Sequence, residues 1–241
     1  MIKAILFDFG QTLVDASDGF RKAEKEAQKE IYYHLHLTNW EKFLSFYREV
    51  RKDYHNKCIF SRTAFWQKIY MDYGKKPERK LLKKWEDEYW QKVKQERVLF
   101  PETVKVLCKL SKGYKLAIIT NSPKQGNNKT YPVQEHPEIK SFFDVIVVAG
   151  EGAIPPKPDP KPFKLCLERL EIKASEAVFV GDDWNIDICG AKNTGIQPIW
   201  IQHHSVKRSW PHIKTDVPII TALQSLLDLE SILHFIPVQI L

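Results

Sequence analysis

The chain has 241 residues, of which 43% are hydrophobic and 28% are charged, and its formal net charge is +7. This length and composition fit one large core, or a core with a second smaller domain, and exclude disordered and collagen-like classes. The longest apolar runs, such as Val145–Ala149, are far shorter than the roughly 18 residues of a membrane span.

Lysines and arginines are interspersed with acids rather than gathered in one stripe, which does not favour nucleic acid as a partner. The start of the chain lacks the apolar run of a signal peptide, so we expect a cytoplasmic protein. We interpret the four cysteines as buried, reduced thiols because none forms a C-x-x-C pair: Cys58, Cys108, Cys166 and Cys189.

In chain order, the first predicted strand is Ile2–Phe7, and the segment that follows carries a helical pattern. Apolar residues at spacings of three and four predict an inserted bundle of helices over residues 17–97, with an aromatic core that includes Trp66, Trp85 and Trp90. Residues 1–16 and 98–241 then form the main domain. The two segments that connect the main domain to the inserted helices are candidate hinges between them: Val14–Gly19 and Arg97–Pro101.

Beyond the insertion, short Val/Ile-rich runs alternate with helical patterns, which is typical of parallel βαβ winding. The predicted strands are 116–119, 145–148, 178–180, 199–201 and an edge strand at 217–220; the predicted helices are 102–110, 161–170, 186–193 and 221–229. The breaker-rich stretch 122–128 predicts a loop, with no helix before about Tyr131. The apolar tail 233–241 has no assigned structure, and we favour its packing on the chain's own sheet.

Polar residues follow three of these strands: Asp8, Thr120 and Asp182. In an open parallel sheet, ligands bind outside the carboxyl ends of the strands. Each residue alone fits an ordinary turn or cap, but together they predict one crevice with two carboxylates and a hydroxyl.

Four segments resemble, in order, the signatures of the haloacid dehalogenase-like hydrolase superfamily, whose members are mostly phosphatases: 7–12 (FDFGQT), 119–122 (ITNS), 157–160 (KPDP) and 181–187 (GDDWNID). The resemblance covers residues 2 to about 229. It implies an α/β fold with a doubly wound, mainly parallel Rossmann-like sheet, and it implies that residues 17–97 are a type-one helical cap that closes over the crevice.

The resemblance also implies the chemistry. Asp8 is expected to attack a small phosphorylated substrate and form an aspartyl-phosphate, with Mg²⁺ held by Asp8, Asp182 and the carbonyl of Gly10. It implies that three residues bind the phosphoryl group: Thr120, Asn121 and Lys157. It also implies two supporting acids: Asp183 supports the metal, and Asp187 holds Lys157 or a metal-bound water.

The sequence departs from the family at Gly10, where most of its phosphatases carry a second Asp that transfers protons to the leaving group. One interpretation is a phosphatase for good leaving groups, or one whose proton donor comes from the cap or the substrate. A carbon–phosphorus hydrolase with a cap lysine is the alternative, and a weakly active interaction protein is a third. The retained Asp182 and Asp187 argue against dehalogenation.

Overall fold

The computed structural model describes residues 1–122, 132–206 and 210–234. The chain divides into two compact units. The core unit holds residues 1–15, 99–122 and the described residues from 132 onward, and the helical unit holds residues 16–98. The predicted loop at 122–128 and the tail after His234 lie, apart from Ser122, outside the described residues.

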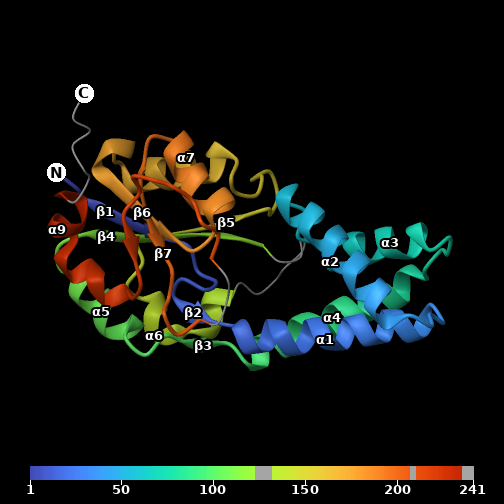
Figure 1. Ribbon diagram of the computed structural model, residues 1–241. Coiled ribbons are helices and arrows are strands. Elements are labelled where there is room, and N and C mark those ends of the chain that lie inside the picture. The colour runs from blue at the N-terminus through green and yellow to red at the C-terminus, as the bar shows by residue number, and fades with distance from the viewer. Residues whose placement is uncertain (123–131, 207–209, 235–241) are drawn as a thin grey trace. The chain divides into compact units, whose positions relative to one another are not determined.

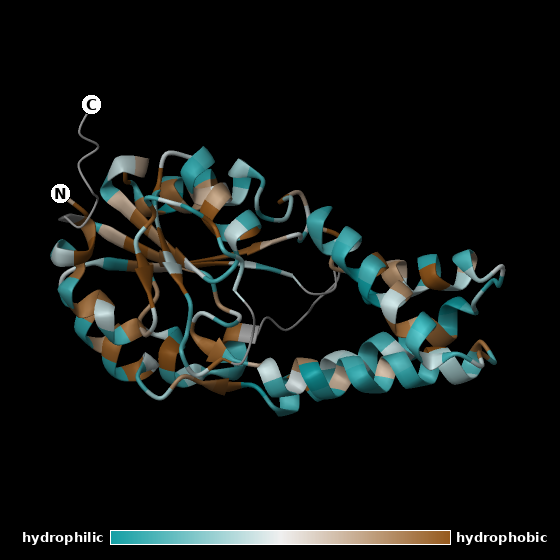
Figure 2. Cartoon of the chain, in the orientation of Figure 1, coloured by the Kyte–Doolittle hydropathy of each residue, from teal (hydrophilic) through white to brown (hydrophobic). Residues whose placement is uncertain are grey.

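The core unit is built on a six-stranded sheet in which every pair of neighbours is parallel. Its order is β5-β4-β1-β6-β7-β8, with bounds β1 Ala4–Phe7, β4 Lys115–Asn121, β5 Val145–Ala149, β6 Ala177–Gly181, β7 Gln197–Ile201 and β8 Ile219–Ile220. The doubly wound parallel fold is therefore confirmed. Figure 2 shows these strands as predominantly hydrophobic, as expected for a sheet covered on both faces.

Alternate residues of each strand enter different cores on the two faces of the sheet. Ile5 and Phe7 pack with α5 (Thr103–Leu110), whereas Ala4 and Leu6 pack with α7 (Pro160–Leu170). Figure 1 shows α5 and α7 on opposite sides of the sheet. This double cover fixes the register of the central strands, because a shift by one residue would exchange the two faces.

The remaining elements of the core unit are short. β2 (Val14–Asp15) pairs as a two-stranded sheet with β3 (Val98–Leu99), whose first residue belongs to the helical unit. The others are η1 (Pro132–Glu135), α6 (Pro137–Lys140), η2 (Ala174–Glu176), η3 (Trp184–Ile188), α8 (Cys189–Asn193), η4 (Leu223–Asp228) and α9 (Leu229–His234). Two predicted helices differ in kind. Residues 184–188 form a π-helical turn before α8, and the predicted helix 221–229 is a 3-10 helix that continues as α9.

The helical unit consists of α1 (Ser17–His34), α2 (Trp40–Asn56), α3 (Arg62–Asp72) and α4 (Arg79–Gln95). Its interior is aromatic, as predicted: Trp66 and Trp85 are buried in it, and Trp90 packs against it. This core also contains polar side chains that are hydrogen-bonded to one another. Tyr89 donates to Glu24 (3.0 Å), and the Arg62 guanidinium donates to Tyr89 (2.8 Å).

The four cysteines are all free thiols, but they differ in burial. Only Cys166 is buried; Cys58 and Cys189 are half-buried, and Cys108 is exposed on α5, so the expectation of four buried thiols is wrong. Within the described ranges, no helix is both long and apolar enough to cross a membrane.

Candidate active site

The candidate site lies at the carboxyl ends of the three central strands of the core unit. Asp8 follows β1, Asp182 follows β6, and Thr120 is the penultimate residue of β4, which neighbours β1. All three side chains are largely buried. This confirms the prediction from the sequence that these three residues share one edge of the sheet.

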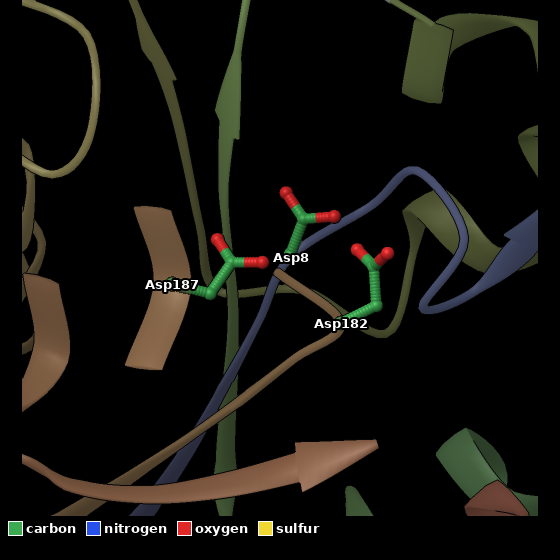
Figure 3. Close-up of side chains that lie close together, drawn as sticks. All are labelled: Asp8, Asp182 and Asp187. Carbon is green, nitrogen blue, oxygen red and sulfur yellow. The ribbon is translucent and has the colours of Figure 1, made fainter. Parts of the chain in front are cut away.

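Three carboxylates meet at this edge. One oxygen from each of Asp8, Asp182 and Asp187 lies within 4.8 Å of the others, and Figure 3 shows the three carboxylates side by side. Asp187 comes from η3. It can approach the end of β6 because residue 181 is glycine: a Cβ at Gly181 would lie 2.5 Å from the Cβ of Asp187.

Lys157 supplies the positive charge of the site. Its Nζ donates to Asp8 Oδ1 and to Asp187 Oδ1, both at 2.7 Å, and its side chain is only 1% exposed. Burial alone would lower the pKa of Lys157, but the carboxylates of Asp187 and Asp8 raise it above its ordinary value. The lysine therefore stays an ammonium between the two acids.

Both oxygens of Asp187 are engaged by the protein. Oδ1 accepts from Lys157, and Oδ2 accepts from the backbone N–H of Asp183 at 3.0 Å. Burial raises the pKa of Asp187, and Asp8 and Asp183 add to this while Lys157 opposes it. These contacts fit a residue that positions Lys157 better than one that binds a metal directly.

Asp183 has a local structural task. Its Oδ1 accepts from the backbone N–H groups of Asn185 (3.0 Å) and Ile186 (3.1 Å), so it caps η3. This cap fixes the turn from which Asp187 projects.

The side chain of Asn121 faces the backbone of Lys157. Its Oδ1 accepts from the Lys157 N–H at 2.8 Å, and its Nδ2 donates to the Lys157 carbonyl at 3.1 Å. Next to it, the buried hydroxyl of Ser122 donates to Glu151. The end of β4 is thereby joined twice to the loop that delivers Lys157, and the amide side chain of Asn121 is committed to that loop.

Gly10 has room for a larger side chain at its Cα. Among the described residues, a Cβ built there meets no atom within 4 Å outside its chain neighbours, and the φ angle of Gly10 is not in the left-handed region. Its backbone pairs with Val14 in a single β-bridge. Nothing in the local backbone therefore requires glycine at this position.

One buried side chain beside this loop is not predicted from the sequence, because no histidine has a spacing or neighbour pattern that marks it as functional. His203 is 1% exposed, stacks on Phe100 with ring centroids 3.6 Å apart, and donates from Nε2 to the Thr12 carbonyl at 3.0 Å. Burial lowers the pKa of His203, which keeps the ring neutral. It supports the loop that follows Asp8.

The donor set fits a hard divalent cation. Three carboxylates are clustered here, two of them paired with Lys157, and carboxylate oxygens are the ligands that Mg²⁺ prefers. Because Asp187 is used by Lys157 and the backbone, Asp8 and Asp182 are the carboxylates best placed to hold the ion.

Comparison with known proteins relates this chain to a family of hydrolases. Residues 5–201 match the family model described as haloacid dehalogenase-like hydrolase. The human N-acylneuraminate-9-phosphatase is 27% identical, over 99% of this chain and 96% of the human protein. The glyceraldehyde 3-phosphate phosphatase of Methanothermobacter thermautotrophicus is 28% identical, over 97% of this chain and all of its own.

Among solved structures, a HAD phosphatase from Thermococcus onnurineus superposes with a TM-score of 0.66 at 22% identity, covering 95% of this chain and 98% of its own. At that identity the likeness concerns the fold, which is shared along almost the whole chain. The family model, by contrast, spans the segments that carry Asp8, Thr120, Lys157 and Asp182. The chain belongs to the haloacid dehalogenase-like hydrolase family, and its curated relatives are phosphatases.

Proposed function

We propose that this protein is a magnesium-dependent phosphatase that hydrolyses a small phosphorylated metabolite through an aspartyl-phosphate on Asp8. The observation that carries the proposal is the Asp8–Lys157–Asp187 arrangement beside Asp182, in a chain whose relatives are phosphatases. Those relatives act on N-acylneuraminate 9-phosphate and glyceraldehyde 3-phosphate by name, and both are small phosphorylated compounds.

In the proposed reaction a carboxylate oxygen of Asp8 attacks phosphorus, the bond from phosphorus to the leaving oxygen breaks, and water later hydrolyses the acyl phosphate. Lys157 neutralises charge on Asp8 and on the arriving phosphoryl group, while Asp187 holds the lysine in place. Thr120 and the backbone amide of Asn121 are proposed donors to the phosphoryl oxygens.

Mg²⁺, when held by Asp8, Asp182 and the Gly10 carbonyl, supplies positive charge that offsets the repulsion between carboxylate and phosphate. Asp183 supports this set through the turn that it caps. At Gly10 no side chain is present to protonate the leaving group, so the proposal favours substrates with good leaving groups, or a donor from elsewhere.

We also propose that the helical unit serves as the cap of this enzyme. It is inserted directly after the Asp8 loop and has a hydrophobic core of its own, so it can fold as one body. Such a cap excludes water and selects the substrate. We expect this cap to close over the site when Mg²⁺ and a phosphate analogue bind. Small-angle X-ray scattering profiles that are identical with and without these ligands would contradict this closure.

The test is phosphate release from an aryl phosphate and an acyl phosphate, with and without Mg²⁺, by the native chain and Asp8→Asn. Asp216→Asn, which changes an exposed acid paired with Lys192, is the matched control against a contaminant. We expect Mg²⁺-dependent release that disappears with Asp8→Asn and persists with Asp216→Asn. Equal release by all three proteins would sink the proposal.

A further inference from the structure

A cavity of about 780 Å³ lies wholly within the helical unit, along α3 and the start of α4. Two lysines and an arginine line it, Lys75, Lys76 and Arg79, together with the apolar side chains of Met71 and Leu82. Among the described residues, no aspartate or glutamate lines it. The residues that line this cavity are different from the three carboxylates of the core unit, Asp8, Asp182 and Asp187.

None of the three cations forms an ion pair with an acid among the described residues. In the described part of the chain, the side chains of Lys75, Lys76 and Arg79 make no ion pair or hydrogen bond. Three nearby acids pair with other lysines: Asp72 with Lys68, Asp87 with Lys83 and Glu88 with Lys84. Glu78 makes no ion pair with a described residue and does not line the cavity. Glu86, which is buried, accepts from the first backbone amides of α3.

The local sequence concentrates this charge. Residues 75–84 hold six lysines and arginines and one acid, and Figure 2 colours the turn between α3 and α4 as hydrophilic. The first turn of α4 contains no acid, and its N-cap residue Glu78 makes no side-chain hydrogen bond. Cations at the positive end of a helix repel the helix dipole as well as one another, so a bound anion would relieve both.

The charge of the whole chain points to the same unit. Residues 16–98 hold 20 lysines and arginines against 13 acids, and this difference equals the formal net charge of +7 of the protein. The core unit is therefore formally neutral, and the helical unit carries the net positive charge, which raises the local concentration of anions.

We propose that the cavity between α3 and α4 binds a small organic phosphate. Its dianionic phosphate is held by Lys75, Lys76 and Arg79, and its apolar part lies against Met71 and Leu82. A dianion matches three clustered cations better than a single carboxylate does. Met71 supports the apolar half, because this large hydrophobic side chain is 61% exposed and lines the cavity. The site does not depend on Asp8 or on any hydrolytic step.

Pyridoxal 5′-phosphate is a suitable probe, because it combines a phosphate, an aromatic ring and an aldehyde. Its aldehyde condenses with a neutral lysine amine, losing water to form an imine, and borohydride supplies the hydride that reduces the imine to a stable amine. With EDTA present, peptide mapping should find Lys75 or Lys76 labelled about tenfold more than the ion-paired Lys83 and Lys84. Equal labelling of the four lysines would overturn the proposal.

Two variants locate the phosphate. Arg79→Ala should lower labelling of Lys75 and Lys76 several-fold, whereas Lys80→Ala, which removes the same charge from a neighbouring residue outside the cavity, should leave it nearly unchanged. Gln67→Glu places an acid in the cavity lining and should also lower labelling. Circular dichroism checks that each variant is folded. An equal loss with Arg79→Ala and Lys80→Ala would show a diffuse charge effect and contradict a built site.

Protection distinguishes an organic phosphate from a bare anion. Phenylphosphonate carries both halves of the proposed ligand, so it should protect Lys75 and Lys76 at about a tenfold lower concentration than inorganic phosphate. Equal protection by the two compounds would contradict the apolar half of the proposal. Labelling of Lys157 is mapped on a separate peptide and reports on the core unit alone.

Discussion

The space at Gly10 allows a substitution that tests whether the missing proton donor limits hydrolysis. A Cβ at this position meets no described atom within 4 Å outside its chain neighbours, and the backbone has no left-handed φ angle, so we expect Gly10→Asp to fold. Since general acid catalysis contributes about a hundred- to ten-thousand-fold, we expect Gly10→Asp to speed hydrolysis of poor leaving groups by about a hundredfold. Aryl phosphates with acidic phenols should gain much less, as a leaving-group series of kcat/KM values would show.

Gly10→Asn is the matched control, because it has the same shape as the aspartate but cannot donate a carboxyl proton. It should leave the leaving-group dependence as in the native chain. If both variants change the series equally, or neither changes it, then the absence of a carboxyl group at position 10 does not limit proton transfer to the leaving group.

Asn121 acts on Lys157 through the backbone. Asn121→Ala removes two hydrogen bonds to Lys157, so we expect a loss of about 1–3 kcal/mol in the free energy of unfolding by urea. Because Lys157 would be held less accurately against Asp8, kcat should fall about tenfold or more while KM changes less. Asn193→Ala, at an exposed asparagine on α8, is the control and should change neither quantity. Native kinetics in Asn121→Ala would refute the positioning role.

These residues differ in how far the sequence could predict them. Asp8 and Asp182 follow apolar strands, and that pattern is enough to place them at one edge of a parallel sheet. The side-chain partner of Asn121 is the backbone of a residue 36 positions later, and a backbone group leaves no signature in the sequence. His203 escaped notice for the same reason, since its partner is the Thr12 carbonyl.

At the scale of elements, α3 depends on an acid from another helix. Glu86 of α4 accepts from Arg62 N–H (2.7 Å), Thr63 N–H (3.2 Å) and the Thr63 hydroxyl (2.7 Å) at the start of α3. Glu86→Gln loses the charge at the positive end of the α3 dipole and should cost about 1–2 kcal/mol. Glu86→Leu leaves all three donors without an acceptor and should cost about 3 kcal/mol or more.

Urea unfolding followed by tryptophan fluorescence measures these losses, because four of the seven tryptophans lie in the helical unit. Glu88→Gln changes an exposed acid on the same helix and should cost less than about 0.5 kcal/mol. An equally small loss in Glu86→Leu would mean that α3 begins without help from α4.

Elements with strong local patterns are predictable from the sequence, and elements set by tertiary packing are not. The buried runs of β1, β4, β5, β6 and β7 stand out because strands covered on both faces are continuously apolar. The π-helical turn of η3 lies outside such patterns, since it is held by Asp183 and by the approach of Asp187 to Gly181. Likewise, apolar spacing in 221–229 indicates a helix but does not separate a 3-10 helix from an α-helix.

At the scale of the whole molecule, the chain forms two hydrophobic cores, and the two segments that connect them start close together in the core unit. The core unit buries residues on both faces of its sheet, and the helical unit buries its own aromatic cluster. Within the core unit, the segment before the insertion meets the segment after it: Phe100 N–H and the Thr103 hydroxyl both donate to the Leu13 carbonyl, at 3.2 Å and 3.0 Å. The chain therefore leaves and re-enters the core unit at nearly the same point.

This geometry predicts that the helical unit can be removed. Replacing residues 16–98 by a short Gly/Ser linker cuts no strand of the six-stranded sheet, and loop closure over so short a gap costs little entropy. We expect the shortened chain to unfold in one cooperative thermal transition and to be stabilised by Mg²⁺ with a phosphate analogue, because every residue of the acidic cluster remains. Its formal charge falls from +7 to zero, so it is best studied at low protein concentration, where aggregation is slow. Under the proposed cap function it should still hydrolyse aryl phosphates but discriminate less among phosphorylated metabolites. Asp8→Asn in the shortened chain separates true turnover from background, and a shortened chain without a cooperative transition would show that the core unit needs the helical unit to fold.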